Sequence, residues 1–136
     1  MKYTFSVPGI VRGKQRARSG NGRHYTPKQT VNAEAWIKQC AVTAHGNLLL
    51  QGPLKVEIHA ISTPAPSWSK TKTNNALCGI IRPTGKPDTD NIAKIACDSL
   101  NGIWWKDDSQ VVTLIVHKFY GPEPELRVSV EAVDTA

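Results

Sequence analysis

The chain has 136 residues, of which 40% are hydrophobic and 21% charged, a composition typical of a soluble globular domain. No apolar run approaches the roughly 18–20 residues of a membrane-spanning helix, and the N-terminus lacks the apolar core of a signal peptide. Three cysteines without a C-x-x-C spacing argue against a disulfide framework or a structural zinc site. We therefore expect one domain over residues 1–136, located in a reducing cytoplasm.

The first third of the chain predicts a strand, a basic loop and a helix. Residues 2–7 (KYTFSV) alternate polar and apolar side chains and end at a Pro-Gly pair. The next segment is rich in glycine and basic residues without periodicity, which predicts an exposed, mobile loop. Thr26 and Pro27 then predict the N-cap and first position of a helix that ends near residue 44. We expect this helix to bury Val31, Ala35 and Val42, together with Trp36 or Ile37.

The middle of the chain predicts a strand and a second long loop. Residues 54–62 (LKVEIHAIS) alternate clearly, and their apolar side consists of Leu54, Val56, Ile58 and Ala60. Residues 63–87 are rich in Pro, Ser, Thr, Lys and Gly, with a helical turn expected near residues 69–77. Long loops in a compact domain are usually functional or disordered, and we expect the same of these two basic loops.

The last third predicts a helix and two strands. Asp90 is the expected N-cap of a helix over residues 91–100, which an Asn-Gly pair ends. Residues 110–120 and 125–133 predict two strands, with Asp107 and Asp108 at the start of the first. The helix is expected to bury Ile92, Ile95, Ala96 and Leu100. The order β-α-β-loop-α-β-β, with two main helices for four strands, favours an α+β fold with both helices packed on a mixed sheet.

Charge is distributed unevenly along the chain. Residues 1–87 carry 13 Lys and Arg and only two acids, Glu34 and Glu57, whereas residues 88–136 carry 4 Lys and Arg and 9 acids. The corresponding balances of +11 and −5 sum to the net charge of +6. A basic excess suits a polyanionic partner such as nucleic acid. The acids nevertheless concentrate in residues 86–110, which hold five of the 11: Asp88, Asp90, Asp98, Asp107 and Asp108.

Several of these carboxylates are expected to lie close together. Asp88 and Asp90 point the same way if their segment is extended, whereas Asp107 and Asp108, adjacent on a strand, point to opposite sides. Two carboxylates about 5 Å apart repel by roughly 3 kcal/mol at an effective dielectric of 20, and Lys94 supplies only one positive charge. A bound Mg²⁺ ion would relieve this repulsion and suggests phosphodiester cleavage. The alternative is a helix cap and a solvated helix face of ion pairs.

The segment KPDTDNIAKIACDSLNGIWWKDDSQVV, residues 86–112, closely resembles the RusA family of Holliday junction resolvases, especially its phage-type members. The matching features are Asp-x-Asp-Asn-x-x-Lys, Asp-x-Leu-Asn-Gly and Trp-x-Asp-Asp-x-Gln, in the family's order and spacing. VRGKQRAR followed by HYTP is similar to the family's basic N-terminal loop, so the resemblance extends loosely over most of the chain. The region after Pro64, with Trp68, Trp104 and Trp105, differs more, which leaves sequence preference and contacts to the junction branches open.

The resemblance implies a homodimeric, Mg²⁺-dependent endonuclease, with Mn²⁺ as a candidate substitute, that resolves four-way DNA junctions by paired symmetric cuts in recombination and repair. If the protein is phage-encoded, it would work in the cytoplasm of a bacterial host. The family's essential acids fall on Asp88, Asp90 and Asp108, expected to bind the metal, and its essential lysine falls on Lys94. Asp98 and Asp107 are candidates for supporting those ligands. The basic residues expected to contact DNA are Arg12, Lys14, Arg16, Arg18, Arg23 and Lys86.

Other functions stay open from the sequence. A nuclease of the same chemistry could act on flaps, mismatches or plain duplex, because the acids define the reaction while the loops define the target. A non-catalytic DNA-binding module could use the acidic cluster to hold a structural ion. Trp104 and Trp105 are more often core residues than DNA wedges, and at a strand start one would be buried and the other would face outward.

Overall fold

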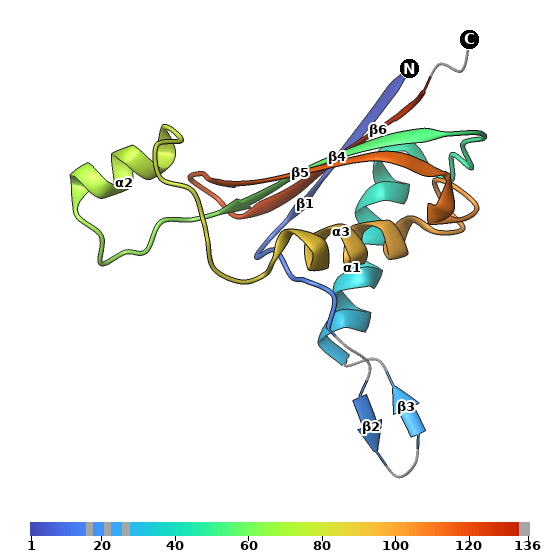
Figure 1. Ribbon diagram of the computed structural model, residues 1–136, viewed down its shortest axis with the longest axis horizontal. Helices are drawn as coiled ribbons and strands as arrows, with labels where there is room; N and C mark the ends of the chain where they lie inside the picture. Colours follow the sequence, from blue (N-terminus) through green and yellow to red (C-terminus); the bar gives the residue numbers. More distant parts are fainter. Residues whose placement is uncertain (16–17, 21–22, 26–27, 134–136) are drawn as a thin grey trace.

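A computed structural model describes residues 1–15, 18–20, 23–25 and 28–133, and the side chains of residues 1–15 and 28–133. A four-stranded mixed sheet carries the fold, with two helices on one of its faces (Figure 1). The strands are β1 (Lys2–Pro8), β4 (Leu54–Ser62), β5 (Val111–Tyr120) and β6 (Glu125–Ala132). The helices are α1 (Lys28–His45), α2 (Lys70–Leu77) and α3 (Thr89–Leu100). The predicted α+β fold with a mixed sheet is confirmed.

The strand order is β1-β6-β4-β5, in which only β4 and β5 run parallel. The connection between these two parallel strands contains α2 and α3, so the long loop and the acidic helix both belong to the crossover. The residues predicted for the apolar side of β4 are all buried, as are the four predicted for the inner face of α3. Among the described helices, none is both long enough and apolar enough to cross a membrane.

Helix α1 buries a different face from the one predicted. Thr30, Ile37 and Ala41 are buried, whereas Val31 is 50% exposed and Val42 40% exposed. Ala35 and Trp36 are exposed as well, so Ile37 alone of the predicted set is buried. The reason is that apolar residues lie on several sides of this helix, and its contacts with β1 and α3 select the face that is covered. The predicted helix start at Thr26 and Pro27 lies outside the described residues.

The two long loops contain more secondary structure than the sequence predicts. In the first, β2 (Arg18–Gly20) and β3 (Arg23–Tyr25) pair antiparallel and lie beyond the N-terminal end of α1, away from the main sheet (Figure 1). A loop without secondary structure was therefore the wrong prediction for these residues. In the second loop, the expected helical turn is α2, whose N-cap Ser69 accepts a hydrogen bond from the Lys72 amide at 3.1 Å.

The segment between α3 and β5 also differs from the prediction. Asp107 is the N-cap of a 3₁₀ turn, η1 (Asp108–Gln110), so Asp107 and Asp108 do not alternate on a strand. Trp104 and Trp105 are both 0% exposed, and the prediction that one faces outward is wrong. Strand alternation does not apply because the chain turns tightly here. The indole of Trp105 donates to Asn101 Oδ1 at 2.7 Å, and Trp104 packs edge-on against Phe5.

Candidate active site

The N-terminal end of α3 carries the first two predicted metal ligands. Asp88, not Asp90, is the N-cap: its backbone is extended and its carbonyl accepts the first helical hydrogen bond from Ile92 at 3.0 Å. Asp90 is already in the first helical turn, so the extended geometry predicted for this pair does not continue to Asp90. Both side chains are exposed at the positive end of the helix dipole, where negative groups are favoured.

The five clustered aspartates divide into two groups by their partners. Asp98 forms an ion pair with Lys14, and Asp107 accepts the Ser109 amide in a capping box completed by Gln110. The Ser109 hydrogen bond lowers the pKa of Asp107. Among the described residues, no hydrogen bond or ion pair engages the remaining three carboxylates, and the Asp88 side chain makes no capping bond. These three are Asp88, Asp90 and Asp108, the residues predicted as metal ligands.

The η1 turn that begins at Asp108 packs against α3. Burial, then the charges of Asp108 and Asp98, raise the pKa of the Cys97 thiol to about 12. Cys97 lies two turns beyond Asp90, or about 10 Å along the helix axis. Between them, a shallow groove is lined by Asp90, Ala93 and two residues of β5, Leu114 and Val116.

The donor atoms of Asp88, Asp90 and Asp108 suit a hard divalent cation, because all are carboxylate oxygens without a protein partner. The three carboxylates do not converge on one point. Within the described part of the chain, their oxygens do not all lie within 4.8 Å of one another. Repulsion between like charges favours such separation when no cation is bound. The residues fit a cation of few protein ligands and several waters.

Lys94 lies one turn from Asp90 on the exposed side of α3. The sequence allows ion pairs of Lys94 with Asp90 and Asp98 at i, i+4 spacing. Neither pair forms in the structure, where Asp98 binds Lys14 instead. Among the described residues no carboxylate lies within 4.0 Å of the Lys94 ammonium. The structure therefore does not support the alternative in which Lys94 forms an ion pair on the helix surface.

The basic N-terminal loop lies directly against the start of α3. The Lys14 amide donates to the Asn91 carbonyl at 2.9 Å. Around this contact, a cavity of about 380 Å³ is lined by residues of the loop, α1 and the start of α3, among them Arg12, Lys86 and Asp88. Arg12 and Lys86 are exposed. Arg16, and the side chains of Arg18 and Arg23, lie outside the described residues.

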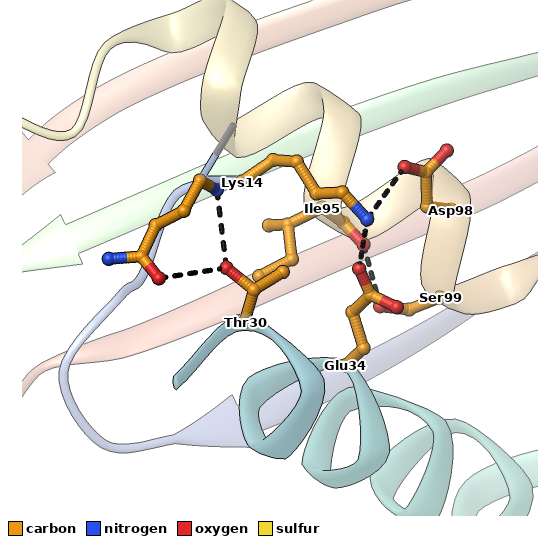
Figure 2. Close-up of polar contacts among 7 residues, drawn as sticks. Lys14, Thr30, Glu34, Ile95, Asp98 and Ser99 are labelled. Atoms are coloured by element: carbon orange, nitrogen blue, oxygen red, sulfur yellow. Dashed lines mark hydrogen bonds and ion pairs between the residues drawn. The ribbon is translucent and has the colours of Figure 1, made fainter. Parts of the chain in front are cut away.

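Lys14 bridges α1 and α3 (Figure 2). Its ammonium contacts Glu34 of α1 and lies 3.3 Å from Asp98 Oδ2 of α3, and all three side chains are between 19% and 24% exposed. Partial burial alone would lower the pKa of Lys14, but hydrogen bonds and charges of Glu34 and Asp98 outweigh it and raise the pKa. The sequence analysis placed Lys14 at DNA and Asp98 behind the metal. The structure pairs the two side chains with each other, a contact that the sequence did not predict.

Replacing Lys14 by Met is expected to destabilise the fold by about 2 kcal/mol, between the values for exposed and buried pairs, since Glu34 and Asp98 would face each other unpaired. For a chain of this size that lowers Tm by about 6 °C. Thermal and urea unfolding would measure it, with Lys38→Met, an exposed lysine of α1, as control. Adding Glu34→Gln to Lys14→Met should recover part of the loss; no recovery would contradict the pairing.

The stabilisation by Lys14 also has a defined pH range. Because folding raises the pKa of Lys14, the folded state binds its proton more tightly than the unfolded chain does. The contribution is fully present below the ordinary pKa of 10.5 and is lost as pH rises through the higher folded value. The stability difference between wild type and Lys14→Met should therefore shrink only above pH 10.5. Urea titrations from neutral to alkaline pH measure this difference.

Gly13 allows the close approach of the loop to α3. A Cβ at Gly13 would lie 2.8 Å from Pro87 Cβ and 3.0 Å from Asn91 Cβ, so one backbone would have to move. Gly13→Ala is expected to cost about 1–3 kcal/mol, as overpacking does. Gly85→Ala is a matched control, because nothing lies within 4 Å of a Cβ there. Equal urea midpoints for the two variants would show that the loop does not need this contact.

Sequence reasoning missed the residues that hold the loop in place. Glu34, Thr30 and Gly13 carry no catalytic pattern, and Thr30 is a buried polar residue whose hydroxyl accepts the Gln15 amide at 3.2 Å. One signal was available: Glu34 is one of only two acids among residues 1–87. An isolated acid in a strongly basic region is a candidate for a structural ion pair.

The helix end thus combines carboxylates that have no partner among the described residues with a nearby lysine and a basic loop, a combination compatible with an enzyme that acts on a polyanion. The family pattern of endodeoxyribonuclease RusA matches residues 7–131 of the chain. The chain therefore belongs to the RusA family of endodeoxyribonucleases. It is also 33% identical over 138 residues to the uncharacterized protein YqaN of Bacillus subtilis (strain 168), a match covering 98% of this chain and 96% of that protein.

Proposed function

We propose that this protein is a Holliday junction resolvase: a structure-selective endonuclease that cuts four-way DNA by paired symmetric cleavage in recombination and repair. Membership in the RusA endodeoxyribonuclease family supports the nuclease activity. The observation that carries the proposal is the partition of the aspartates. The three whose carboxylates have no partner in the described part of the chain are the three that the family's motif marks as essential, and the start of α3 that bears two of them adjoins a basic loop.

We propose that Asp88, Asp90 and Asp108 hold Mg²⁺, or Mn²⁺ in its place. When bound, such an ion supplies Lewis-acid activation of the scissile phosphate and of the attacking water. The carboxylates themselves orient that water through their free oxygens. Cleavage on this scheme leaves a 5′-phosphate. Asp98 and Asp107 act by holding the loop and the η1 turn that position these ligands, rather than by touching the metal or the substrate.

Lys94 is proposed as the residue that stabilises charge on the phosphate in the transition state. Its ammonium is exposed and unpaired among the described residues, so it can donate hydrogen bonds to a phosphate oxygen without first breaking an ion pair. A preorganised donor of this kind is most effective where negative charge develops during the reaction.

DNA binding is assigned to exposed basic residues around the cavity beside Asp88. Arg12 and Lys86 line this cavity, and we propose that both contact phosphates next to the scissile bond. For each phosphate that the protein neutralises, a tenfold rise in salt concentration should lower the affinity by roughly 0.9 log units. Arg16, Arg18 and Arg23 are proposed to extend the contact along the same loop. Lys14 is left out of this set, because its ammonium is engaged by two carboxylates.

Paired symmetric cuts require two active sites related by a two-fold axis, so we propose that the working form is a homodimer. The proposed setting is the cytoplasm, and the host cytoplasm if a phage supplies the gene. Neither proposal changes the chemistry assigned to a single site.

The proposed function is tested by nicking assays on an end-labelled four-way junction and on linear duplex of the same sequence, each with Mg²⁺ and with EDTA. We expect paired cuts at symmetric positions on the junction only, and only with Mg²⁺. Cutting of duplex at the same rate would contradict junction selectivity and favour a general endonuclease. Tight junction binding without any cutting would favour a DNA-binding module with a structural ion.

A further inference from the structure

A second cluster of metal-binding side chains lies on the sheet. Glu57, His59 and His117 each offer one ligand atom, and these atoms lie within 4.8 Å of one another. The alternation along β4 places Glu57 and His59 on the face opposite to Val56 and Ile58, which are buried in the helix-covered core. The cluster therefore occupies the other face of the sheet, where all three side chains are partly exposed.

The backbone holds these three residues at adjoining positions. His59 and His117 are direct partners in the parallel pairing of β4 and β5, so their side chains emerge side by side. Glu57 precedes His59 by two residues and therefore lies on the same face of β4. Because β4 and β5 pair without a register shift from Lys55 to Ser62, the three Cα atoms occupy fixed positions in the sheet.

One pair of ligand atoms already lies at nearly the spacing found around a bound ion, and the others lie within 4.8 Å. His59 Nε2 lies 3.5 Å from Glu57 Oε2, and neighbouring ligands of a tetrahedral Zn²⁺ are about 3.3 Å apart for bonds of about 2.0 Å. The two imidazole rings have centroids 5.1 Å apart at 83°. Phe119 stacks on His117 with centroids 5.5 Å apart and contacts His59 on the other side. These contacts restrict rotation of the rings away from the cluster.

The donor set selects the class of ion. Two imidazoles and one carboxylate suit zinc and similar transition metals, whereas Mg²⁺ prefers oxygen ligands only. Three protein ligands leave a fourth position for water. Two cations of neighbouring segments have other partners: Arg127, opposite His59 on β6, binds Glu125, and Arg82 lies over the Phe119 ring while donating to the Lys118 carbonyl.

We propose that Glu57, His59 and His117 form a binding site for one zinc-class divalent ion, separate from the aspartates of α3. The bound ion links β5, an edge strand, to β4. Since β5 begins directly after η1, this link also steadies the turn that carries Asp108. The site does not depend on the proposed nuclease function.

Calorimetric titration of the chelator-treated protein with Zn²⁺ tests this site, with a large excess of Mg²⁺ present because the carboxylates of Asp88, Asp90 and Asp108 would otherwise take up Zn²⁺ as well. Wild type is expected to bind one Zn²⁺ per chain, and His117→Ala to bind at least about 100-fold more weakly, since even changes behind a ligand cost 10–100-fold. His117→Gln is the second variant if the alanine variant unfolds. His45→Ala, which removes an exposed histidine of α1, and Asp90→Asn are expected to bind Zn²⁺ as wild type does.

Thermal unfolding distinguishes binding of Zn²⁺ at this site from non-specific binding to the protein surface. Zn²⁺ should raise the Tm of wild type and of Asp90→Asn but not that of His117→Gln, because only a ligand held by the folded state stabilises it. The proposal is overturned if wild type shows no saturable binding, or if both His117 variants retain it. Loss of Zn²⁺ binding in Asp90→Asn would overturn it as well, by placing the ion at the aspartates.

Discussion

Asp90→Asn is expected to reduce Mg²⁺-dependent junction cleavage by about 1000-fold, since losing a metal ligand removes several kcal/mol of transition-state stabilisation and each 1.36 kcal/mol is tenfold in rate. The amide matches the carboxylate in size but carries no charge. Asp90 has no hydrogen bond or ion pair among the described residues, so its replacement should leave the fold intact. Junction binding in EDTA should be retained or become tighter, because one negative charge near the DNA is removed. Single-turnover cleavage and gel-shift assays measure the two effects.

The matched control is Asp107→Asn, the same chemical change in the same segment. Asp107 accepts the Ser109 amide as a helix cap, and Asn is an equally good N-cap residue. This variant is expected to cleave within a few-fold of wild type. Asp88→Asn and Asp108→Asn should behave like Asp90→Asn. If Asp107→Asn were as inactive as Asp90→Asn, the partition of the aspartates by their partners would be wrong.

Lys94→Ala should lower the rate of cleavage by about 100–1000-fold, the usual cost of removing one donor to developing charge. Stability should change little, because Ala is a strong helix former and Lys94 makes no ion pair with the described residues. The effect should appear in the single-turnover rate at saturating protein rather than in junction affinity. Such a split distinguishes transition-state stabilisation from general attraction to DNA.

Lys38→Ala serves as the control for charge. Lys38 is exposed in the middle of α1, so its replacement removes one positive charge from a helix surface without approaching the aspartates. We expect a slight loss of affinity and an unchanged rate. If the two variants lost cleavage rate equally, Lys94 would act only through the overall positive charge of the protein. If Lys94→Ala cleaved at the wild-type rate, Lys94 would have no role in the reaction.

Local patterns predicted the elements that have one strongly apolar face. Strand β4 and helix α3 have the predicted buried residues, because a single apolar stripe can pack in only one way. The same reasoning failed for α1, where valines and a tryptophan lie on the exposed side and Thr30 is buried. It failed again at Trp104 and Trp105, because alternation holds for strands and residues 102–104 form a turn.

The candidate site shows the same division. The types and spacing of Asp88, Asp90, Lys94 and Asp108 are legible in the sequence, since metal-assisted cleavage needs carboxylates and a cation whatever surrounds them. The sequence does not show which aspartates form ion pairs or hydrogen bonds within the protein and which remain available to a ligand. Only the packing of the N-terminal loop on α3 brings the ammonium of Lys14 to the carboxylate of Asp98.

The sequence by itself determined the mixed α+β architecture and the place of the acidic segment, because these follow from periodicity and residue type along a short stretch of chain. The tertiary structure alone decided the face of α1 that is buried, the ion pairs of Lys14 and the meeting of His59 with His117 on neighbouring strands. Each of these joins residues at least 20 positions apart, and such contacts depend on which surfaces the packed core brings together.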